Sequence, residues 1–386
     1  MRRDREEAGK NLHKHYFSEH PTYLDRWFRR RFRMSRDLFL RIQNDILSYD
    51  VEPLPSHFEY FIQKRDALGR LGFTTEQNIT SALRQLAYGT AAYMFDEYLQ
   101  MSEATSIICL NMFYKCVLEL YVDGYLRKPT SSDIARLNCA HEEKHGFKGM
   151  LGSINCMHWK WKNCPVAWKG QYTSGHQKHP TIVLEAVASY DTWIWHAFFG
   201  AAADGIYPDW ATLIKAYSTP TDEPRAKFKQ FQESARKDVE RTFGVLQGRF
   251  HILQMAGGPH NVNKLRRILY FCVLFHNMIV EDNGFNITWL EEELLATDEA
   301  NPNYVRNRST SRDVREQEIR DRNVPPNFRT MNVVMSRDTL HKVVLSKDAL
   351  HKVVLSRDAL HKVVLRRDAL YKAVSTITFI KVVFNI

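Results

Sequence analysis

Residues 152–172 read GSINCMHWKWKNCPVAWKGQY, where a β-strand pattern leads directly into a tryptophan-rich segment. Residues 150–157 predict the strand, which Gly152 opens. Residues 180–190 are rich in β-branched side chains and predict a second strand, and residues 192–202 predict a third. The short corner between the second and third strands predicts a β-hairpin.

Helices are predicted on both sides of these strands. Towards the C-terminus, apolar residues recur at three- and four-residue steps over residues 225–250, and a second apolar helix is predicted over residues 265–280. A hairpin beside another strand, with helices before and after it, indicates an α/β layer.

Three helices are predicted before the strands. Thr74-x-x-Gln77 is a capping-box pattern, which starts a helix that runs to the break at Gly89. Thr90 is a predicted cap for a short helix over residues 91–99, and Ser102 is a predicted cap for a longer one over residues 103–121. This spacing matches a helix-turn-helix, and a plain helical packing domain is the alternative.

The composition is that of a globular protein, with 44% hydrophobic and 25% charged residues. The formal net charge of +10 favours a polyanionic partner such as nucleic acid. No run of 18 apolar residues is present, so no membrane span is expected. The six cysteines form no CxxC pair, which favours reduced thiols in an intracellular compartment.

A basic, aromatic segment lies near the N-terminus, where residues 26–33 read RWFRRRFR. We interpret it either as the solvated face of an amphipathic helix or as a surface that contacts DNA phosphates. The candidate DNA-binding residues are Arg26, Arg29, Arg30, Arg31, Arg33, Arg36 and Arg41.

Residues 141–145 read HEEKH and match the HExxH pattern, which on a helix can direct two imidazoles towards zinc. The segment is rich in charge, no third ligand is evident, and Gly146 follows immediately. We therefore interpret it as a solvated helix end.

The C-terminal third is polar and repetitive. Residues 298–332 are rich in Arg, Asp, Asn and Pro and predict a disordered linker. Residues 336–375 hold four near-identical ten-residue repeats, beginning with SRDTLHKVVL. This period fits neither a heptad nor a common solenoid repeat. The near-identity of the copies indicates recent duplication of coding DNA, so no evolved function is expected there.

The motif at residues 152–172 resembles the first catalytic-strand motif of the plant branch of PIF/Harbinger transposases. The resemblance continues through residues 180–199, ADGIYP at 203–208, ARKDVERTFG at 235–244 and FHNMIV at 275–280. It covers about residues 12–283 and implies an RNase H-like nuclease core, in which three carboxylates of a DDE triad hold two Mg²⁺ or Mn²⁺ ions.

Two departures from the family pattern affect this triad. The resemblance places the second carboxylate at Asp204 and the third at Glu240, both as metal ligands, but the first position holds Asn155. An amide contributes one neutral oxygen, so metal affinity is expected to fall. Asn155 and Asp204 are also close in sequence, because the helix and the central strand that precede ADGIYP in relatives are missing.

The expected fold class is therefore α/β: a truncated RNase H-like DDE nuclease core preceded by an all-α, helix-turn-helix-like region and followed by a disordered, repeat-bearing tail. The expected divisions are a polar arm (1–25), a helical region (26–145), the nuclease core (146–283, shortened near residues 202/203), a polar linker (284–335) and the repeats and tail (336–386).

The resemblance implies a metal-dependent DNA endonuclease and strand-transferase that acted at transposon ends, with activity impaired in this chain. Its expected partners are double-stranded DNA of transposon terminal repeats and a Myb-like accessory protein, and its expected location is the nucleus. Two alternatives stay open: a DNA-binding protein without catalysis, and a transposon decay product without a stable fold.

Overall fold

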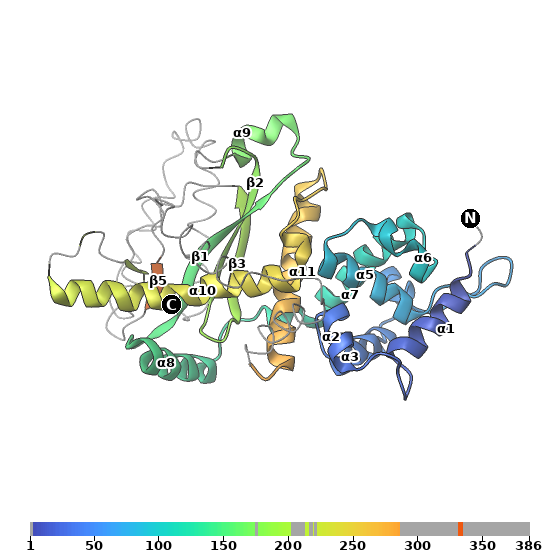
Figure 1. Cartoon of the computed structure of the whole chain (residues 1–386), viewed down its shortest axis with the longest axis horizontal. Helices are drawn as coiled ribbons and strands as arrows, with labels where there is room; N and C mark the ends of the chain where they lie inside the picture. Colours follow the sequence, from blue (N-terminus) through green and yellow to red (C-terminus); the bar gives the residue numbers. More distant parts are fainter. Residues whose placement is uncertain are drawn as a thin grey trace, which may run out of the picture.

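A computed structural model of the chain describes residues 3–173, 177–201, 213–215, 219, 222–285 and 331–334. Figure 1 shows a helical half and an α/β half, with α11 between the sheet and the N-terminal helices. The mixed α/β class that the sequence predicts is confirmed. The RNase H-like identity of the core stays a prediction, and the decapeptide repeats lie outside the described residues.

The helical half contains α1 (Arg5–Tyr16), α2 (Asp25–Phe32), α3 (Arg36–Leu47), α4 (Ser56–Glu59), α5 (Thr75–Tyr88), η1 (Ala92–Phe95), α6 (Asp96–Leu99) and α7 (Glu103–Tyr125). Helix α8 (Ser131–His145) follows and lies against β1 and α10 of the α/β half. Most of these helices surround α5, which is buried on nearly all sides. Residues 5–16, which the sequence leaves in a polar arm, form a helix because Leu12 and Tyr16 are buried among the other helices.

The predicted helix starts in this half are largely confirmed. Thr74 and Gln77 make the reciprocal capping box of α5, and Gly89 ends that helix with a φ of 63°. Ser102 caps α7, as its position predicts. The helix expected over residues 91–99 is instead two single turns, η1 and α6.

Helix α7 is long and apolar enough to cross a membrane by length and composition alone. One of its faces packs in the protein core, where Cys109, Phe113, Cys116 and Val117 are fully buried. The ring of Phe113 lies 5.7 Å from that of Phe271 and 6.2 Å from that of Phe275. The helical half and the α/β half therefore share one hydrophobic core.

The α/β half contains β1 (Met150–Lys160), η2 (Val166–Trp168), α9 (Lys169–Tyr172), β2 (Thr181–Ala188), β3 (Ile194–Ala201), β4 (Leu213–Lys215), α10 (Glu223–Arg249), η3 (His251–Leu253), α11 (Val262–Asp282) and β5 (Met331–Val334). The strand order is β3-β2-β1-β5-β4, and every pairing is antiparallel. The three long strands are those that the sequence predicts.

The two short strands extend the sheet beyond β1. Residues 331–334, which the sequence places in its polar linker, pair with the start of β1. This MNVV segment lies between β1 and β4, and its β-branched valines are residues that favour strands. Its position shows that a linker of polar average composition can still contain a segment able to extend a sheet.

Gly152 has a packing role in β1. A Cβ atom on this residue would lie 2.5 Å from the carbonyl oxygen of Ala188 on β2, closer than real Cβ contacts allow. The glycine therefore permits the close approach of two strand backbones at the start of the motif that the sequence singles out.

Candidate active site

Strand β1 presents Asn155 on the face that packs against α10. On that face, Ser153 donates a hydrogen bond to the carbonyl oxygen of Ala235 on α10 (2.5 Å), and Met157 Sδ lies 3.1 Å from Gln247 Nε2. Side chains alternate along a strand, so Asn155 shares this face with Ser153 and Met157. It therefore lies between two points at which the strand contacts the helix.

The amide oxygen of Asn155 already has a partner. Oδ1 accepts a hydrogen bond from the backbone N–H of Cys156 at 2.8 Å. A carboxylate at this position would offer two charged oxygens, and one could serve a metal while the other kept this bond. The amide has one neutral oxygen, and in this structure that oxygen is used locally.

Glu240 lies on α10, the helix that faces Asn155. Gln247 follows it by two helical turns and contacts Met157, so Glu240 is on the side of α10 that runs along β1. The Glu240 side chain is 41% exposed and forms an ion pair with Arg236 at 3.0 Å. The fold thus brings the helix of the third predicted carboxylate against the strand of the first predicted position.

Asp204 lies outside the described residues. Among the residues that the structure does describe, the predicted triad contributes one carboxylate, Glu240, and one amide, Asn155. A pair of Mg²⁺ or Mn²⁺ ions needs several convergent carboxylate oxygens, so these residues do not fit the metals that the family resemblance implies.

The seven candidate DNA-binding arginines do not form a single free surface. Three of them have partners inside the protein: Arg29 donates to Asn283 at 3.1 Å, Arg36 pairs with Asp25 at 3.0 Å, and Arg41 donates to Tyr125 at 3.1 Å. These contacts position α2 and α3 against the rest of the fold.

The other arginines divide into two kinds. The guanidinium groups of Arg26 and Arg30 lie 5.3 and 5.4 Å from the centre of the Trp27 ring, and Arg31 is exposed. Arg33 ends α2 in the left-handed conformation, with a φ of 63°. Arg26, Arg30 and Arg31 therefore remain as the group best able to contact a phosphate backbone.

The helices with helix-turn-helix spacing have unequal exposure. Helix α5 is almost entirely buried, with Gln77 and Gln85 donating to backbone carbonyls around it. The exposed residues of α7 include Glu103, Ile107 and Ile108, which give that face little positive charge. Neither α5 nor α7 presents a basic face. Within the helical half, the arginines of α2 are therefore the better candidates for contact with DNA.

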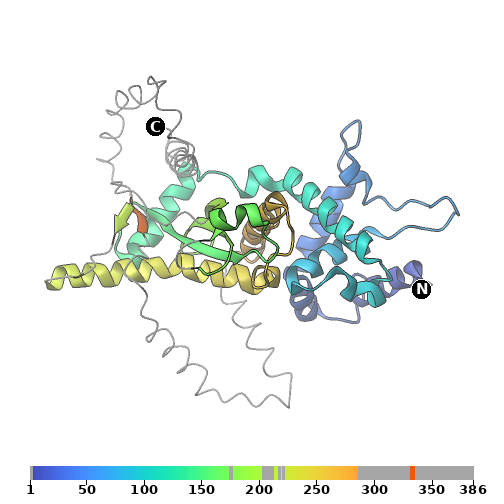
Figure 2. The same ribbon diagram turned by 90° about the horizontal axis from the view of Figure 1, so that it is seen from above.

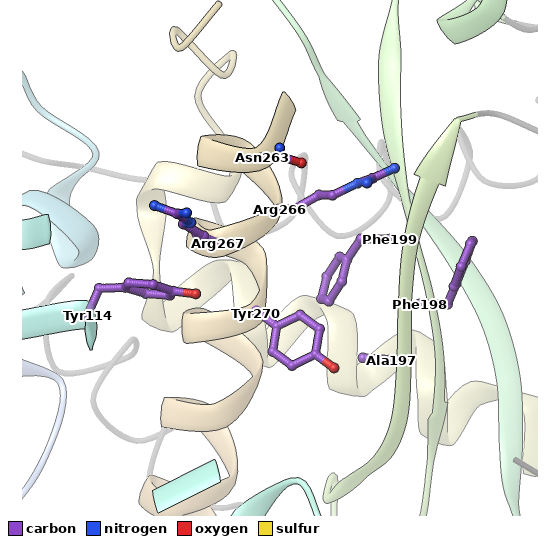
Figure 3. A pocket seen from close by; sticks show the side chains of 8 residues that line it. All are labelled: Tyr114, Ala197, Phe198, Phe199, Asn263, Arg266, Arg267 and Tyr270. Carbon is purple, nitrogen blue, oxygen red and sulfur yellow. The ribbon is translucent and has the colours of Figure 1, made fainter. Parts of the chain in front are cut away.

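A cavity of about 440 Å³ lies between β3, α11 and α7. In Figure 3, Arg266 is directed towards β3, and Arg267 points in the opposite direction, towards Tyr114. Phe199 and Tyr270 pack together below them, with ring centres 5.0 Å apart. None of the residues predicted from the sequence lines this cavity, although its arginines and aromatic rings suit a nucleic acid strand.

The interpretation of residues 141–145 as a solvated helix end was wrong. His141 and His145, expected at a solvated helix end, are 0% and 3% exposed and lie beside Asp238 of α10. The segment is charged, but its histidines share the one face of α8 that packs against the α/β half. The HxxxH spacing was the signal that the sequence offered for this pair. The burial of the two histidines depends on α10, whose Asp238 is 93 residues from His145 in sequence.

Comparison with known proteins gives two family matches. A model of plant transposon proteins matches residues 123–204 and 201–286, and a model of a domain of unknown function matches residues 9–47. No curated protein and no solved structure matches the chain. The matched segments contain β1, β2, β3, α10 and α11. Over residues 123–286, the chain is therefore related to plant transposon proteins.

Proposed function

We propose that this chain is a PIF/Harbinger transposase derivative that binds double-stranded DNA and has lost metal-dependent DNA cleavage. The match to plant transposon proteins is the main support for descent from a transposon. The order of motifs from GSINCMHW to FHNMIV supports the assignment to the PIF/Harbinger family. Transposon terminal repeats are the proposed DNA target, the nucleus is the proposed location, and a Myb-like protein is the proposed accessory partner.

The observation that carries this proposal is the state of Asn155. The residue lies where the resemblance requires the first metal-binding carboxylate, on the face of β1 that packs on α10. Its single amide oxygen is bound to the backbone of Cys156. The position therefore lacks both the charge and the free oxygen that two-metal chemistry uses.

The break in the family match gives further support. The two matched segments overlap at residues 201–204, at the end of β3. This is the point at which the sequence predicts that a helix and a strand are missing. Loss of that strand would remove a rigid support for the second carboxylate, and catalysis depends on such placement.

The decay alternative predicts that the chain has no stable fold. Against it stands a continuous core that joins α5, α7, β1, β2, α10 and α11. A single cooperative thermal unfolding transition of the purified chain would support the folded protein. A broad, non-cooperative transition would favour decay.

The test of function uses the full chain, because α7 of the helical half packs against α11 and a fragment that ends at residue 125 would expose that face. Binding to labelled duplex DNA is measured over a salt series, together with cleavage in Mg²⁺ or Mn²⁺. We expect affinity that falls steeply with salt and no cleavage. Metal-dependent cleavage that Glu240→Ala abolishes would contradict the proposal, as would the absence of DNA binding at low salt.

A further inference from the structure

Three buried side chains from two helices converge at the end of α8. His141 and His145 lie one turn apart on that helix, and Asp238 reaches them from α10. One ligand atom from each lies within 4.8 Å of the others, and the residues are 0%, 3% and 3% exposed. His145 Nε2 and Asp238 Oδ2 are 2.8 Å apart.

His141 is the residue that points to a missing ligand. Both of its ring nitrogens are buried and have no hydrogen-bond partner among the described residues. The ring stacks on that of His145, with centres 5.8 Å apart, and meets the Tyr190 ring edge-on at 5.4 Å. A buried imidazole without a partner is unfavourable, and native proteins seldom leave such groups unsatisfied.

We propose that His141, His145 and Asp238 bind one Zn²⁺ ion, with water as the fourth ligand. Two imidazoles and one carboxylate favour zinc over Mg²⁺, which prefers an all-oxygen shell. Zinc bonds of about 2.0–2.1 Å in a tetrahedron place ligand atoms about 3.4 Å apart, so small side-chain rotations bring this group into range. On binding, the hydrogen between His145 and Asp238 gives way to the ion, and the imidazole keeps its proton on the ring nitrogen that does not bind zinc.

Two cations lie beside the site and act as its outer partners. Lys144 and Arg241 both donate to Oδ1 of Asp238, at 3.0 and 3.1 Å, which leaves Oδ2 for the metal. Their side chains are 41% and 36% exposed, and Arg241 also donates to the carbonyl oxygen of Tyr190. Such outer contacts orient a ligating carboxylate.

The site joins α8 to α10 and is structural in kind. Asp238 lies two residues before Glu240, so a bound ion would fix the helix that runs along β1. Glu142, the residue that an HExxH protease would use as its base, is exposed and pairs with Lys148 at 3.3 Å, away from the cluster. This inference does not depend on the chain's ability to bind or cleave DNA.

The test begins with the full chain stripped of metal by a chelator and dialysed against Zn²⁺ or Co²⁺. We expect one ion per chain, the visible absorption of tetrahedral Co²⁺, and a Tm that rises with zinc. His141→Phe keeps the ring contacts and breaks no hydrogen bond of the metal-free protein, so it should fold normally. It should weaken zinc binding by at least about 100-fold, since even loss of an outer partner weakens sites by 10–100-fold.

His251→Phe is the matched control, because His251 is an exposed histidine in η3. It should leave the zinc stoichiometry and the zinc-dependent rise in Tm unchanged. Asp238→Asn provides a second ligand variant and should also lose zinc binding. Failure of the wild-type chain to bind zinc, or zinc binding that His141→Phe leaves unchanged, would overturn the proposal.

Discussion

Arg249 donates a hydrogen bond to Nδ1 of His276 at 3.0 Å, and both side chains are almost fully buried. Nδ1 must therefore be an acceptor, which places the ring proton on Nε2, where it is donated to the carbonyl oxygen of Thr192 at 2.8 Å. The pair links the end of α10, the middle of α11 and the turn between β2 and β3. This arrangement requires a neutral imidazole.

The neutral state of His276 predicts acid sensitivity. Burial, and then the charge of Arg249, hold the pKa of His276 well below its ordinary value of 6.5. Below pH 6.5 the unfolded chain therefore binds a proton that the folded chain excludes, so the free energy of unfolding falls as the pH falls. Chemical denaturation at several pH values between 7.5 and 5 should show this loss.

His276→Gln isolates the contribution of this residue, since an amide can still accept from Arg249 and donate to Thr192. The variant should lose less stability between pH 7.5 and 5 than the wild type does. His251→Gln, at an exposed position, should retain the wild-type pH dependence. Equal pH dependence in all three proteins would show that His276 does not titrate on unfolding.

The nearly isosteric substitution Asn277→Asp should strongly reduce the free energy of unfolding. Its amide oxygen accepts from the backbone of Ile194 at 2.9 Å, and its nitrogen donates to the carbonyls of Ile194 (2.8 Å) and Tyr125 (2.9 Å). Asn277→Asp would place a carboxylate against two carbonyl oxygens in the core. We expect a loss of roughly 3 kcal/mol in the free energy of unfolding.

The control for Asn277 is Asn263→Asp, the same change at an exposed position near the start of α11. It should alter stability by less than about 0.5 kcal/mol. Urea denaturation of the two variants measures the difference. Similar midpoints for both would mean that the bridge between α11, β3 and α7 is not needed for stability.

Repair of Asn155 alone should not restore cleavage. Asn155→Asp returns a charge to β1, but catalysis also needs a second carboxylate held in place, and Asp204 lies at residues 201–204, where the family match divides into two segments. Mg²⁺- and Mn²⁺-dependent cleavage is compared in Asn155→Asp with and without a family-like insert between Ala202 and Ala203. Only the repaired, lengthened chain is expected to cut DNA.

Cleavage by Asn155→Asp alone, if abolished by Glu240→Ala, would show that the shortened core still assembles a metal site. Glu240→Ala in the repaired, lengthened chain should remove activity. This variant therefore separates cleavage by the predicted site from a contaminating nuclease.

DNA affinity should depend on three arginines of α2, of which Arg26 and Arg31 are exposed and Arg30 is half-buried. Replacement of Arg26, Arg30 and Arg31 by alanine should reduce the slope of log K against log salt by about 3, at about 0.9 per lost phosphate contact. A matched triple variant removes Arg29, Arg36 and Arg41, which have partners inside the protein. It should lower thermal stability more than it lowers the salt slope.

The cavity arginines provide the competing explanation for DNA binding. If Arg266→Ala and Arg267→Ala reduce the salt slope while the α2 variant leaves it unchanged, DNA is held between β3, α11 and α7 (Figure 3). Fluorescence anisotropy with one duplex and one salt series measures all variants. That result would move the DNA-binding surface from α2 to this cavity.

Some elements were predictable from the sequence, and others depended on how distant segments pack together. Helix α10 runs along one side of the molecule, and α8 approaches it from a distant part of the sequence (Figure 2). The helix starts at Thr74 and Ser102 and the three long strands follow from local signals: capping side chains, a left-handed glycine, and alternating or β-branched residues. Local backbone chemistry determines these features, so the sequence suffices.

The sequence alone therefore determined most helices of the helical half, the three long strands and the likeness to plant transposon proteins. Tertiary structure decided which polar groups are buried and what they meet. It gave Arg29, Arg36 and Arg41 partners within the protein. It also buried α5, which the sequence alone could have placed on the surface, and it brought Asp238 to His141 and His145. Burial and ligand convergence arise from contacts between residues far apart in sequence, and no local pattern contains that distance information.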